Sequence, residues 1–302
     1  MGISESLYMP AAIALTANAH APERRSRAIS ILTTAQIIGT IAGGWFAGVM
    51  AERGQWREAF FILGGIGLLF AVPYFRFLRT VDEEAQVETK KSSSRLAARE
   101  IFKVPTYLVM CIVFPVFVFG LWLIYGWLPT FFHDRFDLDL GDAAFNATIF
   151  MQIATLAGIL SGGWLADRLF AITHSSRFWI LIGSILLCAP SMYLLGACES
   201  LTMARIGASA FGLFSGLFIG NVFAASFEVV PADTRASAVG FLNFFGALVS
   251  GFAPLVGGMW KSTLGIEGLL QWTSFAYLIA ALLLAAGVLL LFNKDFERVH
   301  QS

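Results

Sequence analysis

The chain has 302 residues, of which 57% are hydrophobic and 13% are charged, and its mean hydropathy is +0.74. Soluble proteins average roughly 25% charged residues. The 20 Lys and Arg residues balance the 20 Asp and Glu residues, so the net charge of zero points to no charged partner. Apolar runs of roughly 20 residues recur, each long enough to cross the ~30 Å hydrocarbon core as a helix. These properties exclude a disordered, collagen-like, disulfide-stapled or nucleic-acid-binding protein and predict an all-α, multi-pass protein embedded in membrane lipid.

Nine apolar segments bounded by polar residues are predicted to form transmembrane helices. The first is short and contains Glu5, and the fifth contains Gln152 and several glycines. The nine segments cover approximately residues 2–19, 27–50, 57–77, 104–128, 143–166, 178–197, 203–226, 237–260 and 269–292.

A long polar segment, residues 79–103, separates the third predicted helix from the fourth. Its mixed charges and its run of serines cannot be buried in lipid, so we interpret it as a solvated cytoplasmic linker. The chain is thereby divided into three helices over residues 1–78, the linker, and six helices over residues 104–302.

Basic residues are distributed unequally between the two ends of the predicted helices. With the linker in the cytoplasm, all but five of the 20 Lys and Arg residues fall on the cytoplasmic side, in agreement with the positive-inside rule. We therefore expect a protein of the cell (inner) membrane whose N-terminus lies outside and whose C-terminus is cytoplasmic. The five exceptions are Arg53, Arg57, Arg135, Arg205 and Lys261.

A short pattern occurs twice in the chain. The segment from Arg25 to Ala28 opens a predicted helix that runs to Gly48, and the segment from Arg235 to Ala238 opens one that runs to Gly258. The spacings are identical in both copies, and one further helix follows each. The nine helices therefore read as three units of three helices.

Parallel three-helix repeats resemble the architecture of the major facilitator superfamily, which combines four such units in two halves. The segment from Gly162 to Arg168 also resembles the G-x-x-x-D-R loop signature of that family. This resemblance implies that the chain corresponds to a family member without its first three helices. A reading frame that begins at an internal methionine, whose product alone transports nothing, is one explanation.

Two short segments resemble the organic-anion branch of the superfamily, the anion:cation symporters that include sugar-acid permeases. They run from Glu5 to Ala11 and from Tyr125 to Thr130. Spinster-like lipid carriers share a similar stretch at the first position, so the branch stays open. The resemblance implies a secondary active transporter that moves a small organic solute, an organic anion, by proton-coupled alternating access.

An ionisable residue inside a membrane-spanning helix costs about 2.5–3.5 kcal/mol and usually has a function. Glu5 is therefore the candidate proton-coupling residue, and an interfacial position is the alternative. Neutral polar and aromatic residues are the candidate solute-binding groups, although amides also join helices and aromatic residues also anchor helix ends at the membrane surface. The solute-binding candidates are Gln36, Asn243, Asn221, Ser215, Tyr8, Tyr125 and Trp127.

Charged residues near the predicted cytoplasmic helix ends are candidates for conformational control. We expect Asp167 to lie near Arg25 or Arg27, because an acid in the family's short loop is expected to reach the start of a helix in the other half. Arg168 and Arg235 complete this set, and Glu228 is predicted to belong to an ion-pair cluster beside Arg235.

A polytopic membrane enzyme is the rival functional class. The four histidines are dispersed over loops, and the three cysteines show no metal-binding or redox spacing. We therefore predict a transporter, not an enzyme, that uses no metal and no cofactor. The sequence indicates no oligomeric state.

Overall fold

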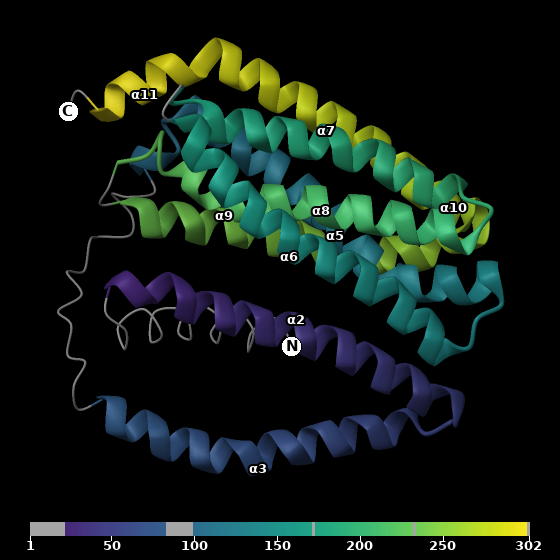
Figure 1. The fold of residues 1–302 in the computed structure, drawn as a ribbon. Coiled ribbons are helices and arrows are strands. Elements are labelled where there is room, and N and C mark those ends of the chain that lie inside the picture. The colour runs from purple at the N-terminus through teal and green to yellow at the C-terminus, as the bar shows by residue number, and fades with distance from the viewer. Residues whose placement is uncertain (1–21, 83–98, 171–172, 232–233, 301–302) are drawn as a thin grey trace. The chain divides into compact units, whose positions relative to one another are not determined.

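The computed structural model of the chain describes residues 22–82, 99–170, 173–231 and 234–300. These residues are helical apart from short connections (Figure 1). The elements are α2 (Pro22–Glu52), α3 (Trp56–Asp82), α5 (Pro105–Phe136), α6 (Leu140–Phe170), α7 (Ser176–Ala197), α8 (Leu201–Ser226), α9 (Arg235–Ser250), α10 (Ala253–Gly287), a π-helical turn (Val288–Phe292) and α11 (Asn293–His300).

The chain forms two compact units. Unit 1 consists of residues 1–90 and 139–145, and unit 2 consists of residues 91–138 and 146–302. In unit 1, α2 packs against α3, and α3 exposes large apolar side chains such as Phe61 and Leu69. A helix that is apolar on all sides is typical of one that faces lipid.

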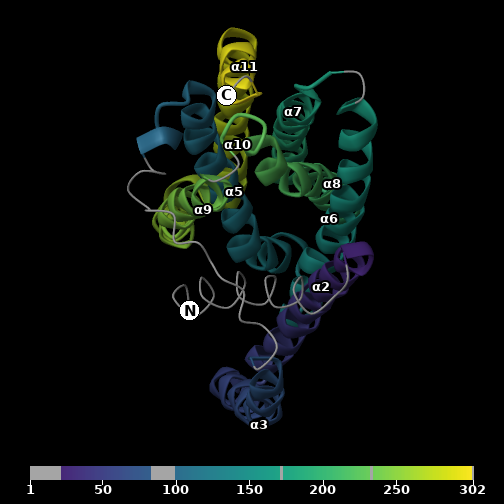
Figure 2. The same cartoon turned by 90° about the vertical axis from the view of Figure 1, so that its left-hand side faces the viewer.

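The helices of unit 2 form a continuous series of neighbours. Helix α8 packs on α7, α7 on α10, α10 on α5, and α5 on α9 (Figures 1 and 2). Helix α6 joins this series through its contact with α8, where Gly158, Gly212 and Gly216 let the two backbones touch. The spacing of four residues between Gly212 and Gly216 places both on one face of α8, as in other close crossings of membrane helices.

Six segments of the described residues are long and apolar enough to cross a membrane. They agree with the multi-pass prediction, but the nine helices in three-helix repeats are not confirmed. The predicted helix over 2–19 lies outside the described residues, α2 is not among the six, and residues 237–299 count as one segment.

The last two predicted helices have different boundaries in the structure. The predicted helix over 237–260 is interrupted after Ser250, where α9 ends, and Pro254 lies in the first turn of α10, a position that suits a residue without a backbone N–H. Helix α10 is in turn interrupted at Gly265, whose backbone (φ 69°, ψ 171°) is not helical and suits a residue without a side chain. Two helices join at this break, which lies between the predicted segments 237–260 and 269–292, where the sequence predicted a connection.

Two tyrosine hydroxyls connect neighbouring helices of unit 2. The Tyr277 hydroxyl on α10 donates to the carbonyl of Phe117 on α5 at 2.6 Å. The Tyr107 hydroxyl on α5 donates in the same way to the carbonyl of Ala238 on α9, also at 2.6 Å. Each hydroxyl thus bonds backbone groups of the next helix, which fixes α10, α5 and α9 in register.

Candidate functional site

A pair of neutral polar side chains joins α5 and α6 well inside their apolar segments. Tyr125 is half-buried, Gln152 is 6% exposed, and their side chains lie close enough to interact. Beside them, the Trp122 ring packs edge-on against Tyr125 with a centroid distance of 6.0 Å, and a Cβ added at Gly126 would meet open space. This arrangement offers hydrogen-bonding groups and an aromatic edge to a bound solute, whereas sequence reasoning singled out Tyr125 and missed Gln152.

Trp127 lies on another side of α5 from Tyr125. Its ring lies against Gly257 of α10, and the Lys261 ammonium lies 5.7 Å from the ring centroid. The indole Nε1 is buried without a hydrogen-bond partner. Trp127 therefore belongs to the contact between α5 and α10, while Tyr125 faces α6.

Ser215 and Asn221 lie at or near the crossing of α6 and α8. The Ser215 hydroxyl is fully buried and donates to the carbonyl of Gly212 in its own helix at 2.9 Å. The Asn221 amide is 2% exposed and donates to the carbonyl of Leu217 at 2.9 Å, next to Gly162 of α6. Both side chains thus satisfy part of their hydrogen bonding within α8.

The remaining predicted solute-binding residues are distributed over both units. Asn243 is exposed on α9 of unit 2, and Gln36 is exposed on α2 of unit 1. Glu5 and Tyr8 lie outside the described residues. The structure thus brings together Tyr125 and Gln152 in unit 2, while Ser215 and Asn221 bond carbonyls of their own helix.

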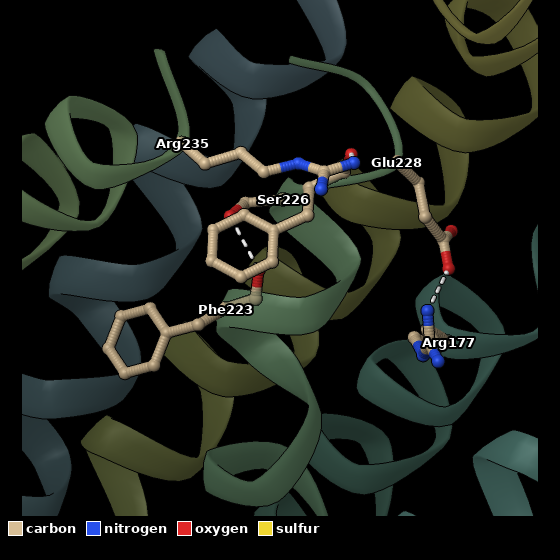
Figure 3. A network of polar contacts seen from close by, with 6 residues as sticks. Arg177, Phe223, Ser226, Glu228 and Arg235 are labelled. Atoms are coloured by element: carbon tan, nitrogen blue, oxygen red, sulfur yellow. Dashed lines mark hydrogen bonds and ion pairs between the residues drawn. The ribbon is translucent and has the colours of Figure 1, made fainter. Parts of the chain in front are cut away.

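An ion pair lies where α7 begins and α8 ends. The Arg177 Nη1 atom donates to Glu228 Oε1 at 2.9 Å (Figure 3). Burial raises the pKa of the Glu228 carboxyl to about 7, although Arg177 acts to lower it. Sequence reasoning placed Glu228 in an ion-pair cluster with Arg235, but Arg235 Nη2 instead donates to the Phe227 carbonyl at 3.3 Å. The missed partner, Arg177, is 51 positions away in the chain.

The other proposed control residues are less fully described. The side chains of Arg25 and Asp167 lie outside the described part of the chain, so the predicted approach of Asp167 to Arg25 stays a prediction. Arg168 is exposed, and its guanidinium lies 5.3 Å from the centroid of the Trp164 ring.

The opposite end of unit 2 has its own charged contacts. Lys261 Nζ donates to Asp134 Oδ2 at 2.8 Å, which ties α10 to the end of α5. Arg135 lies 3.9 Å from Glu267, and its Nη2 atom donates to the Cys198 carbonyl at 3.4 Å. Charged groups of unit 2 therefore gather at both helix ends, and neutral groups lie between them.

The recesses found in the described residues are apolar. One in unit 1 is lined by Ile38, Ile41, Ala42, Trp45 and Phe145, and one in unit 2 is lined by aliphatic and phenylalanine side chains. Among the residues that the structure describes, no group of three His, Cys, Asp or Glu side chains is arranged to hold a metal ion. Neither recess therefore supplies polar groups for a solute.

Comparison with known proteins identifies the family. A model of the Major Facilitator Superfamily matches residues 1–254. A Bacillus subtilis protein described as a niacin/nicotinamide transporter is 25% identical over 99% of this chain and 72% of its own length. An Escherichia coli protein described as an L-galactonate transporter is 24% identical over 85% of this chain and 60% of its own length.

A solved structure shows a similar fold. A bacterial homologue of the human lysosomal transporter Spinster, in an inward-facing and occupied conformation, superimposes with a TM-score of 0.69 at 18% identity. The match covers 95% of this chain and 74% of that one. The family and these relatives are transporters and not enzymes. The chain belongs to the Major Facilitator Superfamily and is an integral membrane protein of the transporter class.

Proposed function

We propose that the chain is part of a secondary active transporter for a small organic anion, driven by protons, with its C-terminus in the cytoplasm. The pairing of Tyr125 with Gln152 is the structural observation that supports a polar organic solute. A hydroxyl and an amide inside apolar helices can hydrogen-bond hydroxyl and carboxylate groups, and the nearby Trp122 edge suits the apolar part of the solute. An anionic solute is supported by the resemblance to sugar-acid carriers and by the L-galactonate relative.

The solute class is tested by uptake into proteoliposomes. The chain spans 72% and 60% of the lengths of the two relatives, so it is assayed both as residues 1–302 and with any upstream coding sequence included, which is called the restored chain. The probes are labelled L-galactonate, nicotinate and neutral nicotinamide. We expect uptake of at least one anion by the restored chain and none by residues 1–302 alone. Uptake of nicotinamide alone would refute the anion assignment, and strong uptake by residues 1–302 would refute the need for further helices.

The role of the neutral pair is tested by substitution. Gln152→Leu removes the amide while keeping a similar volume, and Gln271→Leu is the control because Gln271, on α10, lies against Gly196 of α7. We expect Gln152→Leu to raise KM for the transported solute by about 10-fold, the equivalent of about 1.4 kcal/mol, and Gln271→Leu to leave KM unchanged. Equal KM values for the two variants would remove Gln152 from the binding site.

Proton coupling is assigned to Glu5 in this proposal. Glu5→Gln in the restored chain should abolish uptake driven by a pH gradient and retain solute counterflow, because a permanently neutral side chain mimics the proton-loaded state. Unchanged proton-driven accumulation would refute this assignment.

A Spinster-like lipid carrier is the alternative. The similar solved structure supports the fold alone, because its identity to this chain is 18%. Transfer of a labelled lysolipid by the restored chain, without uptake of any of the three small probes, would favour this alternative.

A further inference from the structure

Glu228 is a buried acid with one oxygen left unpartnered. It lies just beyond the last residue of α8, and its side chain is 6% exposed. Oε1 accepts a hydrogen bond from Arg177, whereas Oε2 is buried and has no hydrogen-bond partner (Figure 3). An ionised carboxylate in this position carries a desolvation cost that a single ion pair offsets only in part. Binding of a proton is the ordinary way for such a group to lower that cost.

We propose that Glu228 is a proton-binding site and that loss of its proton weakens the junction between α7 and α8. The ionised carboxylate keeps its charge attraction to the Arg177 guanidinium, but its Oε2 atom then carries charge in a buried position without a partner. The proton is taken from water and returned to water, so the step needs no other reactant. This site goes beyond the coupling role proposed for Glu5 and does not depend on it.

The neighbouring charges make Arg177 the residue that controls this site. Arg235, at the first residue of α9, is engaged by Phe227, since it donates to the Phe227 carbonyl and lies 5.5 Å from the centroid of the Phe227 ring. Asp295 on α11 accepts a hydrogen bond from the Thr106 amide at 2.8 Å and is occupied there. Further titratable and charged groups near these helix ends are Arg99, Glu100, Lys103, Arg168, His174, Lys294, Glu297 and Arg298, and Asp233 lies outside the described residues.

The Glu228 carboxyl changes its charge near neutral pH. Burial raises the pKa of the Glu228 carboxyl from 4.5 to about 7, and Arg177 acts in the opposite direction. The carboxyl is therefore protonated in mildly acidic conditions and ionised in mildly alkaline ones, where its buried charge weakens the junction. The affected segment is the connection from α8 to α9, residues 227–234, together with the first turn of α7.

Hydrogen–deuterium exchange, measured without any solute, tests the proposal. Exchange of residues 173–180 and 226–236 is compared between the wild type and Glu228→Gln at each pH from 5 to 9. The comparison at equal pH cancels the chemical pH dependence of exchange. We expect faster exchange in the wild type than in Glu228→Gln above pH 8, no difference near pH 5, and a midpoint near pH 7. A difference that is constant over this range, or absent throughout, would overturn the proposal.

A matched acid and the partner residue provide controls. Glu267 faces Arg135 at the other end of unit 2 but is 39% exposed, so Glu267→Gln should leave exchange of the two segments unchanged at every pH. Arg177→Gln removes the cation that favours the charged form. In that background, the Glu228 titration, followed by carboxyl infrared absorption, should move to higher pH. An unmoved midpoint, or an equal effect of Glu267→Gln, would also overturn the proposal, and the Arg177 variant keeps the test decisive if Glu228→Gln fails to fold.

Discussion

Substitution of Gly212 by alanine tests the backbone contact that joins α6 to α8. A Cβ built on Gly212 would lie 3.0 Å from the carbonyl carbon of Met151 and 3.1 Å from its Cα, with the carbonyl oxygen closer still, whereas ordinary contact begins at 3.4 Å. These neighbours are backbone atoms and cannot rotate away, so α6 and α8 must move apart. Gly163, on α6, has nothing within 4 Å of its added Cβ and provides the control.

Two opposing effects determine how much the Gly212→Ala substitution changes the free energy of unfolding. Overpacking in a close-packed interior costs typically about 1–3 kcal/mol, and alanine gains about 1 kcal/mol over glycine in a helix interior. We therefore expect Gly212→Ala to lose up to about 2 kcal/mol of stability and Gly163→Ala to gain up to about 1 kcal/mol. With about 2–4 °C of melting temperature per kcal/mol for a chain of comparable size, the two variants should differ by several degrees.

The measurement is thermal unfolding in detergent, followed with a thiol-reactive fluorescent dye. Cys188 and Cys198 are buried, so they react when the helices separate. Burial raises the pKa of the Cys198 thiol, which keeps it unreactive in the folded protein. If Gly212→Ala melts at the same temperature as Gly163→Ala or higher, the helices do not touch through Gly212 and the packing described here is wrong.

Three further predictions use the same assay. Tyr277→Phe removes the hydroxyl that bonds α5 and should cost about 1 kcal/mol, whereas Tyr193→Phe on an exposed ring should cost nothing measurable. Between pH 4.5 and about 7, Glu228 holds a proton in the folded protein that it has lost in the unfolded chain, so the stability of the wild type falls as pH rises through this window. The melting temperature of Glu228→Gln relative to wild type should therefore rise from pH 5 to pH 8. A difference that does not change with pH would contradict the raised pKa. Lys261→Gln breaks an ion pair with Asp134 whose side chains are 40% and 48% exposed, and it should change the melting temperature by no more than the equivalent of about 1 kcal/mol.

The spanning helices were largely predictable because a helix that crosses lipid must be apolar over about 20 residues. Residues 57–77, 178–197 and 203–226 were predicted from apolar length, and α3, α7 and α8 contain them. Lipid imposes no such condition on a helix break. Helix α9 ends at Ser250, inside a segment that was predicted as one helix over residues 237–260, because the apolar composition continues across the break.

The sequence indicated which types of residue form the candidate site, but not which residues contact each other. Ser215 and Tyr125 were both identified as polar or aromatic residues inside apolar segments, yet Ser215 bonds its own helix and Tyr125 lies close to Gln152 of α6. Gln152 and Arg177 were missed because their partners, Tyr125 and Glu228, lie far away in the sequence. A local sequence pattern does not show which distant residues are in contact.

The distribution of charge within unit 2 limits what this unit can do in transport. Its described spanning segments have ionisable acids and bases near their ends, as in the Lys261–Asp134 and Arg177–Glu228 pairs, and neutral groups such as Tyr125 and Gln152 between them. A carboxylate at the level of Gln152 would receive hydrogen bonds from unit 2 but no compensating positive charge, and an uncompensated charge in a low-dielectric interior is costly. If the solute is an anion, its countercharge must come from outside the described residues of unit 2. Unit 2 would then determine the shape and polarity of the solute, and the discrimination between nicotinate and nicotinamide would be made elsewhere.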